Sequence, residues 1–155
     1  MNFKSYIVLI LILFLSRDII AQKKTTTIHI LNADKADYDE RLGKDIQRLI
    51  GNVVMRQDST YFYSDSAYYN EKTKFFDGFG NVHIEVNDST DIYSDLLKYN
   101  GNAKFAELFH NVVLKDDSTT LRTEYMPYDR VGHLATYPNK GTITSNDKKL
   151  VSTKG

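Results

Sequence analysis

The sequence contains no cysteine, no tryptophan and only two prolines among its 155 residues. Without cysteine the chain cannot form a disulfide, bind a metal through thiolates, use a Cys nucleophile or carry acyl chains on a lipobox Cys. Burial of apolar surface and backbone pairing must therefore hold the fold together.

Long apolar runs are also scarce. The longest spans nine residues, from Ile7 to Leu15, and ends at the polar residues 16–18. A membrane-spanning helix needs about 20 apolar residues. Lys4 before the run and Ala21 after it are typical of a secretory signal peptide at residues 1–21, which predicts export to the periplasm. An uncleaved N-terminal anchor is the alternative. Residues 22–155 remain for one domain or one run of repeats.

Basic and acidic residues are balanced in number. Lys plus Arg and Asp plus Glu both total 20, and removing residues 1–21 leaves 18 basic against 19 acidic residues. The 11 Tyr and 8 Phe, interleaved with Lys, could stack on nucleic acid bases. The balanced charge and the predicted export argue against a nucleic-acid partner. Cross-strand packing in a sheet is the ordinary use of such tyrosines.

Signals for catalysis are few. The four histidines, His29, His83, His110 and His133, occupy non-equivalent positions, and no nucleophile, zinc or P-loop motif is found. Asp-rich turns at 58, 88 and 116–117 could suggest calcium, but they lack the spacing of known calcium loops, and turn capping explains them. The sequence therefore predicts no enzyme, cofactor or metal site.

What the sequence does contain is a repeat. Three segments have similar sequences: GNVVMRQDST at 51–60, GNVHIEVNDST at 80–90 and HNVVLKDDSTT at 110–120. Asn52, Asn81 and Asn111 are 29 and 30 residues apart, and Gly141 lies 30 further on. A second anchor has the same period, and it consists of Tyr38, Tyr69, Tyr99 and Tyr128, each followed by Asp or Asn. Such a period indicates one structural unit per repeat.

Each unit reads as three short strands separated by turns. Val82, Ile84 and Val86 alternate with polar residues, as in a strand with one buried face. The Asn-Asp-Ser-Thr type segments and the Asn100-Gly101 step predict turns. The stretch at 34–51 places Leu42, Ile46 and Leu49 at helical spacing, so a short helix is an alternative there. The fold class predicted for the whole is all-β.

A unit of about 30 residues with one apolar face cannot bury that face alone, so the repeats must stack. Strands folded into two facing layers would enclose an elongated apolar interior. If this interior is closed, its residues are structural, and the protein is a structural or protein-binding module of the envelope. If it is open, the interior is a lipid-binding surface.

The predicted signal peptide is followed by units that contain Gly-Asn-Val, an Asp-Ser-Thr turn, Tyr-Ser-Asp, Tyr-Asn and a Phe-containing return. This arrangement resembles the OstA-like, or LptA-type, periplasmic lipopolysaccharide-transport proteins. The resemblance covers residues 28–152. It implies a repeat-built antiparallel β-jellyroll, a twisted, V-shaped slide with open ends. It also implies a carrier that shields the acyl chains of lipid A between the two membranes, while copies join head to tail or dock to envelope proteins through edge strands.

Carried over residue by residue, the resemblance implies a set of inward-facing, lipid-binding side chains. These are Val53, Met55, Phe62, Phe75, Val82, Ile84, Ile92, Phe105, Val112, Leu114 and Leu121. A slip of one residue would turn any of them outward.

The last unit departs from the pattern. It stops at KKLVSTKG, partway through a repeat, so either the chain is a fragment or its last strand is left as a docking edge. Thr142 and Thr144 stand in place of the Val/Ile pair under this alignment, which predicts a more polar C-terminal end.

Overall fold

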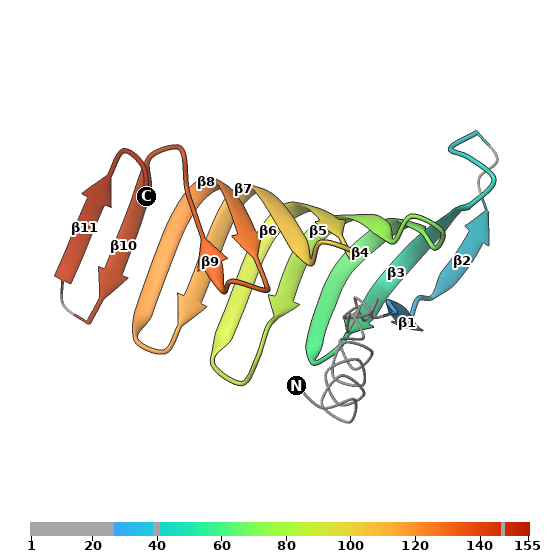
Figure 1. The fold of residues 1–155 in the computed structure, drawn as a ribbon, viewed down its shortest axis with the longest axis horizontal. Coiled ribbons are helices and arrows are strands. Elements are labelled where there is room, and N and C mark those ends of the chain that lie inside the picture. Colours follow the sequence, from blue (N-terminus) through green and yellow to red (C-terminus); the bar gives the residue numbers. More distant parts are fainter. Residues whose placement is uncertain (1–26, 39–40, 147) are drawn as a thin grey trace, which may run out of the picture.

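The computed structural model describes residues 27–38, 41–146 and 148–155, and this part of the chain forms a single antiparallel sheet of 11 strands (Figure 1). The predicted signal peptide lies outside the described residues. The all-β prediction is confirmed, and the alternative helix within 34–51 is wrong, because strands and a turn occupy the described part of that stretch. The strands are β1 (His29–Asn32), β2 (Lys35–Tyr38), β3 (Ile46–Gln57), β4 (Thr60–Asn70), β5 (Phe75–Glu85), β6 (Thr90–Asn100), β7 (Phe105–Asp116), β8 (Thr119–Asp129), β9 (Leu134–Ala135), β10 (Gly141–Ser145) and β11 (Lys148–Ser152).

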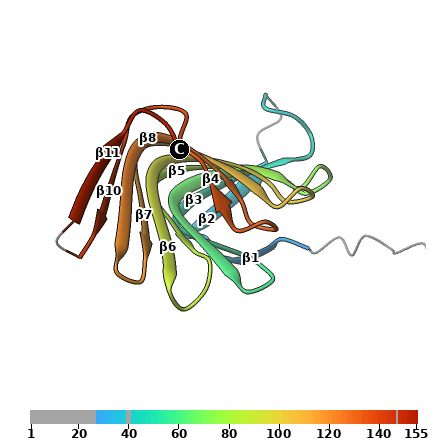
Figure 2. The ribbon, with the colours of Figure 1, turned by 60° about the vertical axis from the view of Figure 1, so that its left-hand side comes forward.

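Neighbouring strands in the sheet follow the order of the chain, from β1 through β3 to β8 and then β10 and β11. β1 and β2 pair with opposite ends of β3, and β9 and β10 pair with opposite ends of β8. The strands stack along the long axis of the molecule, with β1 and β2 at one end and β11 at the other (Figures 1 and 2). Because the two ends do not pair with each other within the described residues, the sheet stays open.

Each repeat consists of two long, bent strands and not of the three short ones predicted. β5 joins the segment around Phe75 to the segment around Val82 without a break. The register shifts between Phe79 and Val82, where Gly80 and Asn81 have φ values of +71° and +44°. Such a bulge bends a strand and keeps it in the sheet. The polar Gly-Asn step is therefore a corner within one continuous strand.

The corner explains why Asn recurs in the repeat. Asn81 Nδ2 donates to Asp65 Oδ2 at 2.9 Å, and Asn111 makes the same bond to Asp95 at 2.7 Å. Asn and Gly tolerate the left-handed backbone that this bend requires. The Asn and the Asp of the Tyr-Ser-Asp segment thus hold adjacent bent strands together at the same level.

The second anchor of the repeat is an Asx turn that follows a buried tyrosine. Asn70 Oδ1 accepts from the backbone N–H groups of Lys72 and Thr73. Asn100 and Asp129 accept in the same way from residues two and three positions later. These side-chain bonds reverse the chain after β4, β6 and β8.

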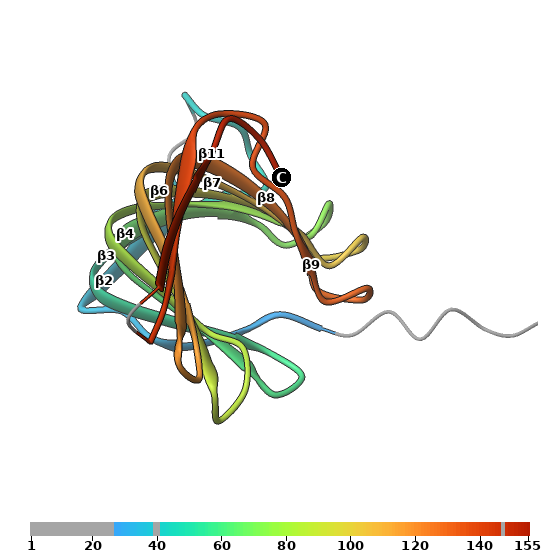
Figure 3. The same cartoon turned by 90° about the vertical axis from the view of Figure 1, so that its left-hand side faces the viewer.

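Bending the long strands β3 to β8 at the same level gives the sheet two limbs, which form a C-shaped cross-section (Figure 3). The first limb ends at the turns after β3, β5 and β7, and the second at the turns after β4, β6 and β8. The gap between these two sets of turns is called the mouth below. Apolar side chains of both limbs face each other inside and form a single buried cluster.

Two predicted inward positions are wrong. Phe75 and Phe105 are 49% and 36% exposed, whereas the next residues, Phe76 and Ala106, are buried at 3% and 0%. The bulge adds a residue between this part of the strand and the Val82 part. Buried residues on β5 nevertheless keep the same parity on both sides of the corner, at Phe76, Val82 and Ile84, so Phe75 faces outward. The parity of buried residues changes on the partner strand β6, from Ile92 to Leu97.

The last repeat also follows a different register from the predicted one. Gly141 pairs with Thr123, the partner of Val112, so Gly141 stands in the Val position and not in the Asn position. Ile143 then pairs with Leu121 and packs against the core. The prediction that Thr142 and Thr144 replace the inward pair is wrong, because they alternate with the inward residues.

Candidate functional site

The interior is a continuous apolar surface that runs along the whole sheet. In the first limb, one inward residue of each strand lies directly opposite its neighbour on the next strand. This row comprises Ile30, Met55, Phe62, Ile84, Ile92, Leu114, Leu121, Ile143 and Leu150. Its two ends are exposed, Ile30 at 37% and Leu150 at 59%, whereas Ile84 and Ile92 in the middle are fully buried.

Most of the predicted site residues belong to this interior. Eight are at most 7% exposed, and they are Val53, Met55, Phe62, Val82, Ile84, Ile92, Val112 and Leu121. Leu114 is partly buried against the same cluster. The structure thus brings nine of the eleven together and leaves out Phe75 and Phe105. The side chains of these nine residues fill the middle of the interior, which becomes more accessible toward β1 at one end and toward β10 and β11 at the other.

Aromatic side chains from both limbs meet in the interior near the mouth. The ring centroids of Phe62 and Tyr99 are 4.7 Å apart, and each ring also packs on Phe76, at 5.2 and 5.1 Å. Tilted and edge-on pairs of this kind stabilise a core beyond their buried area. Because Phe62 belongs to the first limb and the other two to the second, these contacts join the limbs.

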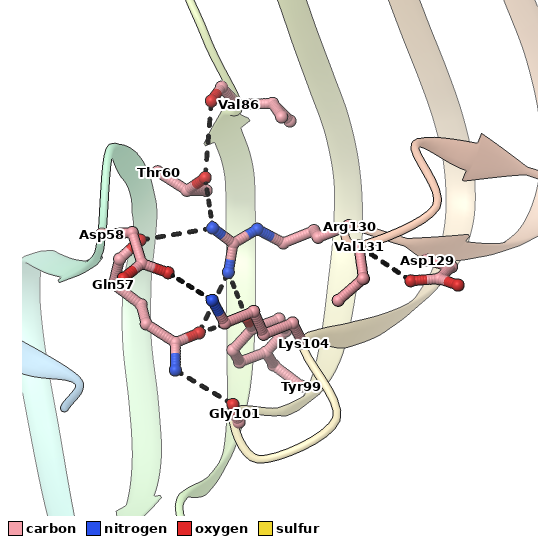
Figure 4. A network of polar contacts seen from close by, with 10 residues as sticks. All are labelled: Gln57, Asp58, Thr60, Val86, Tyr99, Gly101, Lys104, Asp129, Arg130 and Val131. Atoms are coloured by element: carbon pink, nitrogen blue, oxygen red, sulfur yellow. Dashed lines mark hydrogen bonds and ion pairs between the residues drawn. The ribbon is translucent and has the colours of Figure 1, made fainter. Parts of the chain in front are cut away.

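A polar cluster closes the mouth above these rings (Figure 4). Gln57, at the end of β3, is fully buried and donates from Nε2 to the carbonyl of Gly101 at 3.0 Å. Its Oε1 accepts from Arg130 at 3.0 Å and from the Tyr99 hydroxyl at 2.5 Å. Arg130 also donates to Thr60 Oγ1 at 2.6 Å. We call these four side chains, Gln57, Thr60, Tyr99 and Arg130, the mouth clasp.

An ion pair beside the mouth clasp joins the same turns. Lys104 Nζ lies 2.8 Å from Asp58 Oδ2, so the turn after β6 is bound to the turn after β3. Burial raises the pKa of Tyr99 to about 12, against an opposing effect of Arg130. Tyr99 therefore stays protonated at neutral pH and can donate to Gln57, while Arg130 donates to both. The limbs are held together by directional bonds as well as by packing.

Side chains near the two ends of the chain close the interior further. Ile28, 4% exposed, packs on Gly101 so closely that a Cβ there would lie 2.6 Å from its Cδ1. Toward the C-terminus, Tyr137 is 7% exposed and its ring occupies the space next to Gly141. A side chain at either glycine would displace these residues. Glycine at 101 and 141 is therefore required by packing.

The outer face carries an aromatic ladder that includes one of the histidines. His83 stacks between Tyr63 and Tyr93, with ring centroids 5.2 and 4.5 Å away. Its Nε2 lies 2.6 Å from Asp91 Oδ1. These are cross-strand contacts on the side of the sheet opposite the interior, as predicted for the tyrosines.

The described residues contain no group of three or more His, Cys, Asp or Glu side chains arranged to hold a metal ion. They also contain no helix with the length and apolar character that a membrane crossing requires.

Sequence reasoning missed the mouth clasp. Gln57 lies two positions after Met55, where an alternating strand places an inward side chain. This alternation is the signal from which its inward position could have been predicted. Arg130 belongs to the Asx turn of a repeat copy that matches the other copies less well, and its partner Gln57 is 73 residues away. No local pattern reveals such a contact.

The fold and its interior define an open-ended antiparallel β-jellyroll. The model of the OstA-like protein family matches residues 25–155, and the chain belongs to this family. Its structure is similar to the crystal structure of LptH, the LptA-homologous periplasmic component of the lipopolysaccharide transport device of Pseudomonas aeruginosa. The TM-score is 0.61 at 16% identity, over 73% of this chain and 82% of LptH, which shows the likeness of the fold alone. No curated protein sequence matches the chain.

Proposed function

We propose that this OstA-like protein is a periplasmic lipopolysaccharide-binding component of an envelope transport system. In this proposal the interior shields lipid A acyl chains on their way between the inner and outer membranes. The observation that carries it is the continuous apolar row from Ile30 to Leu150, which spans the molecule and is exposed at both ends. Each CH₂ group removed from water contributes about 0.8 kcal/mol. The proposal assigns no reaction and no cofactor to the chain.

Acyl chains must displace protein contacts to enter, because the middle of the interior is filled. Leu114 and Ile143, partly buried near the C-terminal end, mark the more accessible entrance. Separation of the limbs at the mouth would extend this entrance toward Phe62. The family membership and the likeness of the fold to LptH support a carrier. In the lipid-bound form that we propose, the limbs lie further apart than in the structure described above.

The buried interior also favours a second function. Residues such as Leu49, Ile84 and Leu108 have no exposed surface, as in an ordinary core. A closed core would make the protein a structural or protein-binding module that spans part of the envelope. Lipid access to the interior decides between the two functions.

A photo-crosslinking pair tests this access. Leu114 faces the interior and Val113, its neighbour on β7, faces outward, and both are partly exposed. With a diazirine amino acid at 114, we expect irradiation in the presence of lipopolysaccharide to produce a lipid adduct detectable by immunoblotting. The same group at 113 should give only background, because it points away from the interior.

Equal labelling at both positions would indicate non-specific contact with lipid. Absence of labelling at both would rule out the carrier and leave the structural module. Adjacent positions on one strand make the pair a matched control, since both are partly exposed and belong to the same element.

We further propose that copies associate head to tail through their edge strands. β11 pairs with β10 alone among the described strands, and its Leu150 continues the inward row with an exposed side chain. At the other end, β1 presents Ile30 in the same row. Adding β1 of one copy to β11 of the next would pair both open edges and extend the apolar row across the joint.

Charge at this joint should prevent the association. We expect the unaltered protein to form concentration-dependent oligomers in sedimentation equilibrium. Leu150→Glu should abolish them, because the carboxylate would enter the apolar row. Val151→Glu is the control, since Val151 pairs with Thr142 on the opposite face and is similarly exposed at 51%. An unaltered protein that is monomeric at every concentration would contradict the proposal.

A further inference from the structure

Arg130 is a cation placed across the mouth of an apolar interior. Its backbone N–H donates to the carbonyl of Lys104 at 3.1 Å, which fixes the turn after β8 beside the turn after β6. From there its side chain crosses to the first limb, where it donates to Gln57 and Thr60. Figure 4 shows the guanidinium reaching the end of β3 from the opposite limb.

The acceptors that Arg130 contacts are all uncharged. They are the side-chain and backbone oxygens of Gln57, the Thr60 hydroxyl and the Tyr99 hydroxyl. No carboxylate forms an ion pair with Arg130 within the ranges that the structure describes, and the nearby Asp58 is paired with Lys104. Nε of Arg130 is buried and has no hydrogen-bond partner. A half-buried cation without an anion, and with a buried donor left unused, is an expensive arrangement for stability alone.

The same guanidinium lies directly above the aromatic part of the interior. Its Cζ is 5.6 Å from the ring centroid of Phe62 and 5.8 Å from that of Tyr99. Apolar side chains thus lie immediately below a positive charge. An amphiphile with apolar chains and an anionic headgroup has the complementary distribution.

We propose that Arg130, with the Lys104 ammonium beside it, is the binding site for a phosphate headgroup of the lipid whose acyl chains enter the interior. This inference rests on the proposed carrier function. Phosphate offers the guanidinium bidentate, charge-assisted bonds, including one to Nε, and these are stronger than bonds to neutral oxygens. The phosphate replaces Gln57 and Thr60 as acceptor, and the turn after β3 is released from the second limb. Headgroup binding therefore opens the mouth at the point where the chains must pass.

The binding test uses two probes, lipid A carrying its phosphates and the same lipid A with the phosphates removed. We expect the unaltered protein to bind the phosphorylated probe at least about tenfold more tightly, as a charged hydrogen-bonded pair implies. Arg130→Gln should bring this ratio close to one while the affinity for the dephosphorylated probe is retained, which also shows that the variant is folded. Arg122→Gln, an exposed Arg on β8, should keep the full ratio.

Each other outcome has a distinct meaning. If the unaltered protein binds neither probe, the carrier function itself fails. If it binds both probes equally, and Arg130→Gln does the same, the carrier function stands and the phosphate site is overturned. If inorganic phosphate binds with the same dependence on Arg130 while the two lipids are bound equally, the site belongs to free phosphate and the headgroup assignment is overturned.

Opening of the mouth has its own measurement. The chain lacks cysteine, so single Cys residues at Ser59 and Val131, both exposed, can carry two spin labels on opposite sides of the mouth. Pulsed electron spin resonance should show the distance between the labels lengthen with phosphorylated lipid A and stay constant with the dephosphorylated lipid. A distance that is unchanged by the phosphorylated lipid would overturn the release of the clasp.

Discussion

Leu97→Ala is expected to lower the free energy of unfolding by about 3–5 kcal/mol, near the upper end of the range for buried Leu→Ala changes. Leu97 is 1% exposed and lies opposite Gly78 on β5 and Leu108 on β7. Gly78 has no side chain, and Ala67 beyond it has a small one, so Leu97 fills space that these neighbours cannot occupy. The cavity left by the substitution should therefore stay open. Urea denaturation followed by circular dichroism measures the loss.

The preceding residue provides the matched control. Leu96 lies on the outer face between Phe79 and Phe109 and is partly exposed. Leu96→Ala should cost less than about 1 kcal/mol, since most surface substitutions have small effects. Equal losses for the two variants would contradict the strand parity on which the inward set of residues depends. Because stacked repeats share one core, a single transition is expected for both variants.

Gln57→Leu is the second substitution with a large expected effect, about 3 kcal/mol of stability. Leu fits the apolar surroundings but removes the acceptor for Arg130 and Tyr99 and the donor to the Gly101 carbonyl. Buried polar groups that lose their partners cost about 1–3 kcal/mol each, and more when charged. Hydrogen exchange should also accelerate in the turn after β6, because the limbs would lose their directional connection.

Two variants check that explanation. Gln47→Leu places the same substitution on β3 at a side chain whose bond to Tyr38 is exposed to solvent, and it should change stability by less than about 0.5 kcal/mol. Gln57→Glu keeps acceptors for Arg130 and should recover part of the loss. A Gln57→Leu protein as stable as the unaltered one would show that the mouth clasp does not hold the limbs together.

The sequence by itself determined the repeat, the all-β class and most of the interior. Periods of 29 and 30 residues place Val53, Val82 and Val112 in equivalent positions, and alternation within each strand then assigns their neighbours. These inferences are local, because a strand reverses the direction of its side chains at every residue. The same local chemistry accounts for the turns at Asn70, Asn100 and Asp129.

Tertiary structure alone decided what lies beyond the corners and across the mouth. The left-handed step at Gly80 and Asn81 gives β5 one residue more than β6 at the corner, so the buried positions on β6 change from Ile92 and Ser94 to Leu97 and Tyr99. The contact between Gln57 and Arg130 joins residues 73 positions apart, and it exists because the long strands β3 to β8 all bend at the same level. Periodicity carries no information about an added residue or a distant partner. Only the folded chain shows both.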